Sequence, residues 1–217
     1  MDIILDDREV RILGCLIEKE MTTPEYYPLS LNSLTNACNQ KSNRNPVVAY
    51  DEAVIEQGLG SLQSKGLARK THTAGSRVDK YLHALLDTFD LSKPEMAVLC
   101  ELMLRGPQTA GELRSRAERM TPFENLDKMD ETLRGLQEHD PTLVLQLPRE
   151  TGRKERRFIH LLSGSVNAAA DADRPEATSP PSMSPDERLC IMEEEIERLR
   201  TEVKELRQAF AEFRAQF

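Results

Sequence analysis

Apolar residues recur at helical spacing in three stretches near the start of the chain, and polar turns separate these stretches. The periodicity predicts helices over residues 6–21, 30–39 and 51–65. The polar turn 40–46 joins the second helix to the third, and Gly66 ends the third helix. We therefore expect three successive helices in the first part of the chain.

Two short strands are predicted next, over residues 67–72 and 80–85, with a glycine-containing loop between them. Helix, turn, helix and hairpin together form the plan of a winged-helix domain, a helix-turn-helix variant usually found on nucleic acid. We therefore predict that residues 1–87 form a winged-helix domain in which the hairpin is the wing.

The same plan recurs between residues 88 and 162, in the same order. Capping residues open its helices, and a second hairpin closes it. The helices are expected to begin at Ser92, at Thr109 and at Asn125 or Asp127, and the strands to cover 143–147 and 157–162. The predicted fold class is mainly α with small β-hairpin wings (α+β), arranged as two tandem winged-helix domains.

The composition then shifts to Ala, Asp, Pro and Ser, which predicts a flexible linker over residues 163–184. A last helix is predicted over 185–217, where apolar residues recur in steps of three and four. β-Branched residues at a positions with Leu at d positions favour a parallel two-stranded coiled coil. The residues predicted to form this dimer seam are Leu189, Met192, Ile196, Leu199, Val203, Leu206, Phe210 and Phe213, with Phe217 at the end.

Charged residues beside the seam agree with a parallel pair, because each g position faces an opposite charge at an e position of the partner helix. The three complementary pairs are Arg188 with Glu193, Glu195 with Arg200, and Glu202 with Arg207. The alternative is an amphipathic helix that folds back on its own domains. That alternative predicts a wider apolar face and no such pairing of charges.

The formal net charge of -8 argues against a protein that coats nucleic acid by bulk electrostatics. Most of this charge lies in the last segment, because residues 1–86, 87–162 and 163–217 carry -1, -2 and -5. Any basic surface on the two predicted domains must therefore be local.

Cations gather in the polar turn and in the two hairpins, where they could grip the nucleic-acid backbone or the minor groove. These candidate nucleic-acid-binding residues are Lys41, Arg44, Arg69, Lys70, Arg77, Lys80, Arg149, Arg153, Lys154, Arg156 and Arg157. The helices that would enter the major groove are instead rich in Glu and Asp, which repel phosphate. Hairpin loops are also charged simply because water surrounds them, so the cations alone do not decide the function.

Two functions remain open from these residues. The first is a dimeric DNA-binding or regulatory protein that uses the hairpins and the 39–46 turn, with double-stranded DNA as partner. The second is a protein–protein interaction scaffold resembling the condensin accessory subunits, which carry tandem winged helices on acidic chains. The acidic helices favour the scaffold, and the basic hairpins favour DNA.

Motifs for catalysis, cofactors and metals are not found in the sequence. The four cysteines and four histidines share no ligand spacing, so the cysteines are expected to be reduced, buried thiols of a cytoplasmic protein. No apolar run is long enough for a membrane span, and the acidic start of the chain does not resemble a signal peptide. We therefore expect no enzyme activity, no cofactor and no membrane partner.

Residues 39–48, followed by Tyr50, Asp51 and Glu52, resemble the signature of the YceH-like family. Residues 13–19 and 22–32 are similar to that family as well. The resemblance covers residues 5 to about 162 in pattern and implies a bacterial protein with two winged-helix domains. The family is one of uncharacterised function, so the resemblance implies no catalytic residues.

Overall fold

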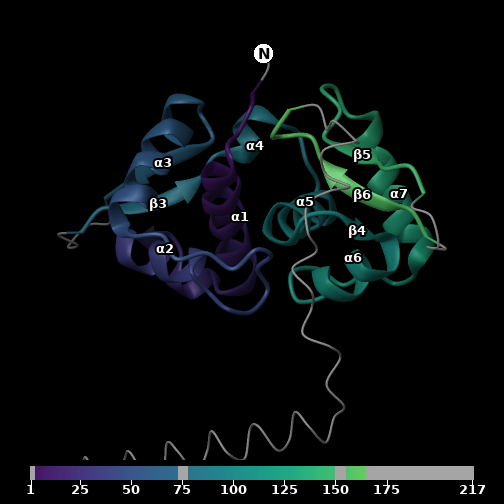
Figure 1. Ribbon diagram of the computed structural model, residues 1–217, viewed down its shortest axis with the longest axis horizontal. Coiled ribbons are helices and arrows are strands. Elements are labelled where there is room, and N and C mark those ends of the chain that lie inside the picture. Colours follow the sequence, from purple (N-terminus) through teal and green to yellow (C-terminus); the bar gives the residue numbers. More distant parts are fainter. Residues whose placement is uncertain (1–2, 73–77, 150–154, 165–217) are drawn as a thin grey trace, which may run out of the picture. The chain divides into compact units, whose positions relative to one another are not determined.

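Helices and small antiparallel sheets make up the described part of the chain, residues 3–72, 78–149 and 155–164 of the computed structural model (Figure 1). These residues form seven α-helices, a short 3-10 helix and two three-stranded sheets, so an α+β fold is confirmed. They belong to one compact unit, Met1–Arg174, and a second unit covers Pro175–Phe217. The predicted coiled coil lies in the second unit, outside the described residues, and the predicted linker is described only at residues 163–164.

The first helix, α1 (Asp7–Thr22), begins directly after the predicted capping residue, Asp6. The Asp6 carboxylate accepts backbone N–H groups of Arg8 and Glu9, and the Glu9 carboxylate accepts the Asp6 N–H at 2.7 Å. These bonds satisfy donors that the first turn of a helix leaves without partners. The short helix η1 (Pro24–Tyr26) and the two-residue strand β1 (Leu29–Ser30) follow.

The other predicted helices and hairpin of the first half are also present. Helices α2 (Leu31–Cys38) and α3 (Glu52–Ser64) are capped by the side chains of Ser30 and Asp51. Strands β2 (Ala68–Thr71) and β3 (Lys80–His83) form the predicted hairpin. The predicted end of the second strand at residue 85 is wrong, because Leu85 begins the short helix α4 (Leu85–Thr88).

The second half, from α5 to β6, repeats the order of the first half. Asn125, rather than Asp127, caps its last helix by accepting the N–H of Lys128 at 2.9 Å. Capping boxes at Ser92 and Thr109 open the other two helices, as predicted. The elements are α5 (Lys93–Arg105), β4 (Gln108–Thr109), α6 (Ala110–Ala117), α7 (Leu126–Glu138), β5 (Val144–Gln146) and β6 (Arg157–His160).

Each hairpin gains a third strand that the sequence does not predict. The sheets have the orders β1-β3-β2 and β4-β6-β5, and every pairing is antiparallel. Both added strands are two residues long and directly precede a helix, so they are too short for any alternation of apolar and polar residues. The identical strand orders show that the two halves repeat a single topology.

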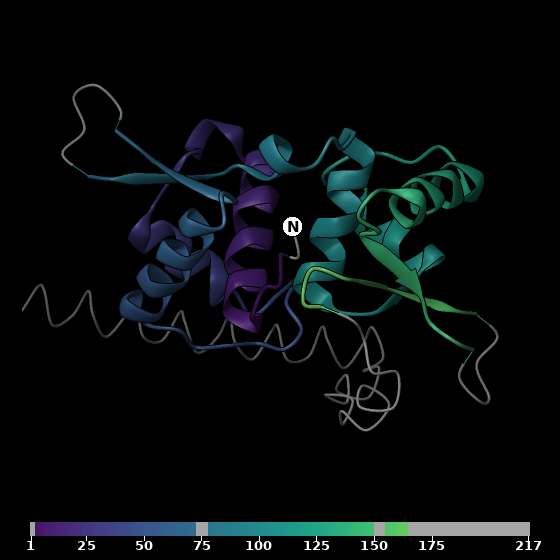
Figure 2. The ribbon, with the colours of Figure 1, turned by 90° about the horizontal axis from the view of Figure 1, so that it is seen from above.

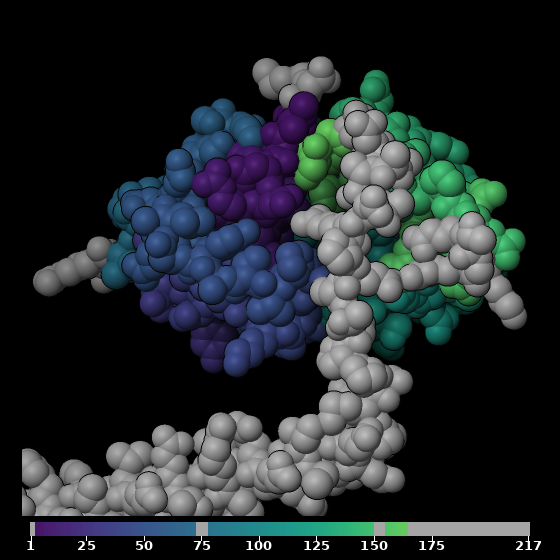
Figure 3. Space-filling view, viewed as in Figure 1, coloured from purple at the N-terminus to yellow at the C-terminus, as the bar shows by residue number. Residues whose placement is uncertain are grey.

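The two halves share one hydrophobic core, in which α1 packs against α5 (Figures 1 and 2). The helices approach closely at Gly14, whose carbonyl oxygen lies 3.3 Å from the Cys100 Sγ. A side chain at Gly14 would collide with Leu104, which is fully buried. The beginning and end of the described chain also meet, because the Leu5 N–H donates to the Leu162 carbonyl at 2.8 Å (Figure 3).

Replacement of Gly14 by alanine tests this packing. The added Cβ would lie 2.9 Å from Leu104 Cδ2 and 3.3 Å from Met103 Cβ, so it overpacks a site that has little room to adjust. Overpacking costs about 1–3 kcal/mol, which exceeds the gain of about 0.5–1 kcal/mol from removing a helical glycine. We expect Gly14→Ala to lower the free energy of unfolding by about 1–2 kcal/mol in denaturant titrations.

Gly60 of α3 provides the matched control, because no atom lies within 4 Å of the position of its added Cβ. Gly60→Ala should therefore raise the free energy of unfolding, by about 0.5–1 kcal/mol. If Gly14→Ala and Gly60→Ala changed the free energy of unfolding equally and in the same direction, the result would contradict the close approach of α1 to α5.

Candidate functional site

The cations of the first hairpin lie close to carboxylates of the same chain. Arg69 Nη2 lies 2.8 Å from an oxygen of Asp87, and Lys70 forms an ion pair with Asp79. The Asp79 carboxylate raises the pKa of the Lys70 amine. Lys80 is half-buried in β3, and Arg77 lies outside the described residues. Two of the four predicted cations of this hairpin are therefore compensated within the chain.

The second hairpin holds its cations differently. Arg156 Nη1 donates to the neutral Gln146 Oε1 at 3.1 Å, and Arg157 Nη1 donates to the Pro107 carbonyl at 2.8 Å. Among the residues that the structure describes, no carboxylate forms an ion pair with Arg156 or Arg157. Arg149 is exposed. Within the described residues, Arg156 and Arg157 are therefore less compensated by carboxylates than Arg69 and Lys70 of the first hairpin. Two predicted cations of the second hairpin, Arg153 and Lys154, lie outside the described residues.

The polar turn 40–46 separates its two predicted cations. Lys41 is exposed, as a nucleic-acid contact requires. Arg44 is only 6% exposed, so its assignment as a nucleic-acid-binding residue is wrong for this structure. Its guanidinium forms two bonds to the Glu18 carboxylate, at 3.0 and 2.5 Å, and two to the Ala37 carbonyl, at 3.1 and 2.9 Å.

Glu18 explains why Arg44 is buried. A buried carboxylate requires a partner with several donors, and a guanidinium supplies two parallel N–H groups. Burial alone would raise the pKa of Glu18, but the hydrogen bonds and charge of Arg44, together with Arg119, lower it. Glu18 is therefore an anion in the folded protein, and the turn is shaped to bring Arg44 to it.

Arg119 connects this ion pair to the second half. Its Nη1 lies 2.5 Å from Glu18 Oε1, and its Nη2 lies 2.8 Å from Glu101 Oε1. Arg105 Nε in turn lies 3.1 Å from Glu101 Oε2, and its Nη2 donates to Asn43 in the turn. Cations and carboxylates thus alternate from α1 to the end of α5. We call Glu18, Arg44, Glu101, Arg105 and Arg119 the central ion network.

Sequence reasoning missed this network, although α5 contained a signal for it. Ala97, Val98 and Leu104 flank Glu101 at helical spacing, and a carboxylate among such residues requires a buried partner. The identity of the partners was not visible, because Arg119 lies 101 residues after Glu18 along the chain.

The outer faces of the helices expected to read DNA are acidic. The exposed charged residues of α7 are Asp127, Lys128, Asp130, Glu131, Arg134 and Glu138. Lys128 is engaged by Glu131, at 2.7 Å. Glu52 and Glu56 are exposed on α3. Both faces would therefore repel a phosphate backbone.

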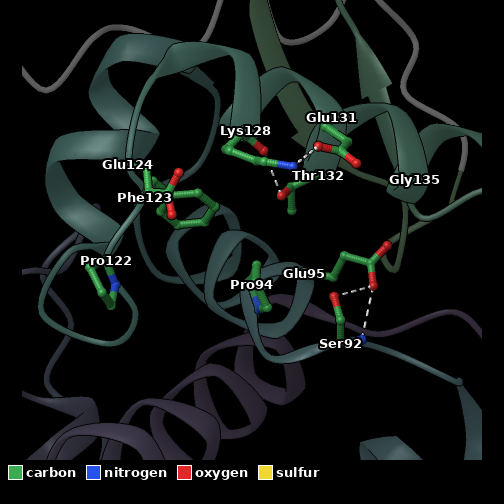
Figure 4. Close-up of a pocket in the computed structure, with 10 residues that line it drawn as sticks. All are labelled: Ser92, Pro94, Glu95, Pro122, Phe123, Glu124, Lys128, Glu131, Thr132 and Gly135. Atoms are coloured by element: carbon green, nitrogen blue, oxygen red, sulfur yellow. Dashed lines mark hydrogen bonds and ion pairs between the residues drawn. The ribbon is translucent and has the colours of Figure 1, made fainter.

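An open groove of about 490 Å³ lies between α7, residues 122–124 and the start of α5 (Figure 4). Four of its polar side chains are engaged in two pairs. Lys128 pairs with Glu131, and the Glu95 carboxylate accepts from the backbone N–H and hydroxyl of Ser92. The groove therefore offers no set of polar groups that defines a ligand.

Metal and membrane sites are not found in the described parts of the chain. Those residues contain no group of three or more His, Cys, Asp or Glu side chains arranged to hold a metal ion. Their helices also include none with the length and apolar character needed to cross a bilayer. Cys15, Cys38 and Cys100 are buried free thiols, as expected, and Cys190 lies outside the described residues.

Comparison with known proteins places the chain in a family. Residues 5–153 match a family model described as a protein of unknown function, DUF480. A UPF0502 protein of Pelobacter propionicus is 51% identical over the full length of both chains, and one of Geobacter sulfurreducens is 52% identical over the full length of both. A UPF0502 protein of Koribacter versatilis is 56% identical over 75% of each chain. The chain therefore belongs to this uncharacterised bacterial family.

Replacement of Arg44 by methionine tests the importance of the Glu18–Arg44 pair. The change removes one of the two arginines of the central ion network that pair with the buried Glu18 carboxylate, so that only Arg119 remains. Breaking a buried ion pair costs about 3–5 kcal/mol. We expect Arg44→Met to lower the free energy of unfolding at neutral pH by this amount. Lys41→Met in the same turn should change it by less than about 0.5 kcal/mol, because Lys41 is exposed.

The decrease in the free energy of unfolding caused by Arg44→Met should also depend on pH and should be smaller in acid. The folded-state pKa of Glu18 is below its ordinary value of 4.5, so its contribution is present above pH 4.5 and disappears as the pH falls through the folded-state pKa. The difference between wild type and Arg44→Met should therefore shrink in acid. A difference that is independent of pH would contradict the role of an ionised Glu18.

Proposed function

We propose that the two halves are winged-helix domains and that the protein is a DNA-binding regulator. The repeated order of three helices and a hairpin, with identical strand order in both sheets, supports this proposal. Fold alone does not define function, so the surface must supply the contact with DNA.

The main support for the proposal is that the cations of the two hairpins have different partners. Arg69 and Lys70 of β2 are paired with carboxylates, whereas Arg156 and Arg157 of the second hairpin bond to neutral oxygens. Binding of phosphate to a compensated cation requires an existing ion pair to break, whereas an uncompensated cation has no such competitor. We therefore place the main DNA contact on the β5–β6 hairpin.

The acidic helix faces limit the form of this contact. Glu and Asp on α3 and α7 would repel the backbone on either side of the major groove. The proposed contact is therefore made to phosphates or in the minor groove, and it carries little base readout. Such binding depends steeply on salt concentration.

A second candidate function is a protein–protein interaction scaffold built on the same winged-helix domains. The acidic exposed face of α7 supports it, because this face could pair with a basic partner protein. The two candidates differ in their affinity for duplex DNA at low salt.

Arg156→Ala tests the DNA proposal. We expect it to weaken binding to random duplex DNA and to lower the slope of log affinity against log salt by about 1, because one phosphate contact is lost. Arg69→Ala is the matched control in the first hairpin and should change both quantities less, since Asp87 already engages Arg69. Fluorescence anisotropy across a salt series measures both quantities.

Two results would count against this assignment. Equal effects of the two alanine variants would remove the special role of the second hairpin. No binding of the wild type at about 50 mM salt would favour the scaffold, since electrostatic binding is strongest at low salt.

We also propose that the protein is a parallel homodimer joined through its C-terminal helix. The heptad pattern of residues 189–217 supports this, and each large apolar side chain removed from water contributes about 1.5–3 kcal/mol. A coiled coil of four heptads is only marginally stable, so we expect the dimer to dissociate on dilution.

Leu199→Asp should break the dimer, because it places a charge at a d position opposite its own copy. Thr201→Asp adds the same charge at an outward f position and should leave the dimer intact. Sedimentation at micromolar concentration distinguishes the two. A monomeric wild type, or a dimer unaffected by Leu199→Asp, would disprove the coiled-coil proposal.

A further inference from the structure

The open groove between α7, residues 122–124 and the start of α5 combines apolar walls with negative charge (Figure 4). We call it the α7 groove. Its volume of about 490 Å³ lies within the range of about 300–1,000 Å³ that is typical of ligand sites. Pro94, Pro122 and the half-buried Phe123 supply apolar surface, and Gly135 adds no side chain. The groove therefore has room for a large apolar side chain that enters from solvent.

Carboxylates outnumber cations among the described residues that line the α7 groove. These carboxylates are Glu95, Glu124 and Glu131, and Lys128 is the single lining cation. Lys128 lies 2.7 Å from Glu131, and the hydrogen bond to Glu131 and the charge of Glu124 raise the pKa of its amine. This pair leaves Glu95 and Glu124, neither of which forms an ion pair with another described residue. Two negative charges of the groove are therefore uncompensated.

The helix starts beside the groove do not turn it into an anion site. Backbone N–H groups at the start of a helix attract anions when they lack partners. Such donors are already engaged at α5, by the capping box of Ser92 and Glu95, and at α7, by the Asn125 side chain. Glu95 bonds to Ser92 through Oε2, whereas its Oε1 lies 2.6 Å from the position of a Cβ added at Gly135. The charges of the groove therefore favour a cationic ligand.

A peptide suits these features better than a metal ion or a small ligand. A metal ion requires several oxygen ligands at once, and the described residues contain no group of side chains arranged to supply them. The polar groups of the groove do not by themselves define a small ligand. A peptide can place one side chain against the apolar walls and its cations along the carboxylates. Asp127 and Asp130, which are exposed on α7, extend the negative charge beyond the groove.

We propose that the α7 groove binds a short basic segment of a partner protein. One large apolar side chain of the segment inserts between Pro94 and Phe123, and flanking lysines or arginines lie against Glu95 and Glu124. Apolar anchors in pockets supply most of the affinity of such contacts, and complementary charge supplies specificity and rapid association. This mode of binding rests on the scaffold function proposed above and names its site and the chemistry of its partner.

Fluorescence anisotropy with the full-length protein tests this site. The probe is a labelled dodecapeptide of lysine and glycine with a central phenylalanine. Two matched peptides replace the phenylalanine with alanine, or every lysine with glutamate. We expect saturable binding of one phenylalanine peptide per chain, binding of the alanine peptide that is at least fivefold weaker, and no binding of the glutamate peptide.

Glu124→Arg should weaken binding of the phenylalanine peptide at least tenfold, because it reverses a charge of the groove that no described cation engages. Glu138→Arg is the matched control, since it makes the same change of charge at the exposed last residue of α7, outside the groove. It should weaken binding less than twofold. NMR of the wild type keeps the test independent of variant folding, because the peptide should shift the resonances of the Phe123 ring and the Thr132 methyl group, which line the groove.

Three results would overturn the proposal. The first is no saturable binding of the phenylalanine peptide up to about 1 mM, the concentration that corresponds to a very weak contact. The second is unchanged Phe123 and Thr132 resonances when the peptide is bound. The third is equal weakening by Glu124→Arg and Glu138→Arg, which would leave α7 as a diffuse acidic surface. That last result would retain the scaffold function without the groove. Arg156→Ala should not change peptide binding, so the test is also independent of the DNA contact.

Discussion

The buried carboxylate of Glu18 is the constraint on which much of this structure depends. It lies on α1 with almost no exposure, so it must be matched by charge from elsewhere in the chain. Arg44 supplies that charge from the turn after α2, and Arg119 supplies it from the segment after α6. One acidic residue therefore fixes the path of a loop in the first half and holds the second half against it.

Buried charge of this kind contributes more to a unique arrangement than to net stability, because desolvation offsets most of the attraction. Apolar side chains could pack α1 against α5 in more than one register. The geometry of the ion pairs that Glu18 and Glu101 form with three arginines admits far fewer arrangements. The close approach at Gly14 acts in the same direction, since only a position without a side chain allows the two helices to meet there.

Local patterns predicted most of the secondary structure, and they failed where long-range contacts decide. Capping residues and apolar periodicity located both hairpins and six of the seven α-helices of the described residues, because these signals lie within a few neighbouring residues. The strands β1 and β4 exist through pairing with β3 and β6, so two residues of sequence could not reveal them. Arg44 was assigned to the surface because polar turns are usually exposed, and its distant partner Glu18 reverses that expectation.

The packing of α1 against α5 has a consequence for synthesis on the ribosome. The face of α1 that carries Gly14 and Glu18 emerges early, but α5 is completed only at residue 105. At about 5–20 residues per second, this face waits roughly 4–17 s for its partner. During that interval the nascent first half exposes apolar surface and lacks one arginine partner of Glu18. The chain is therefore most vulnerable to misassociation or chaperone capture before its second half has been translated.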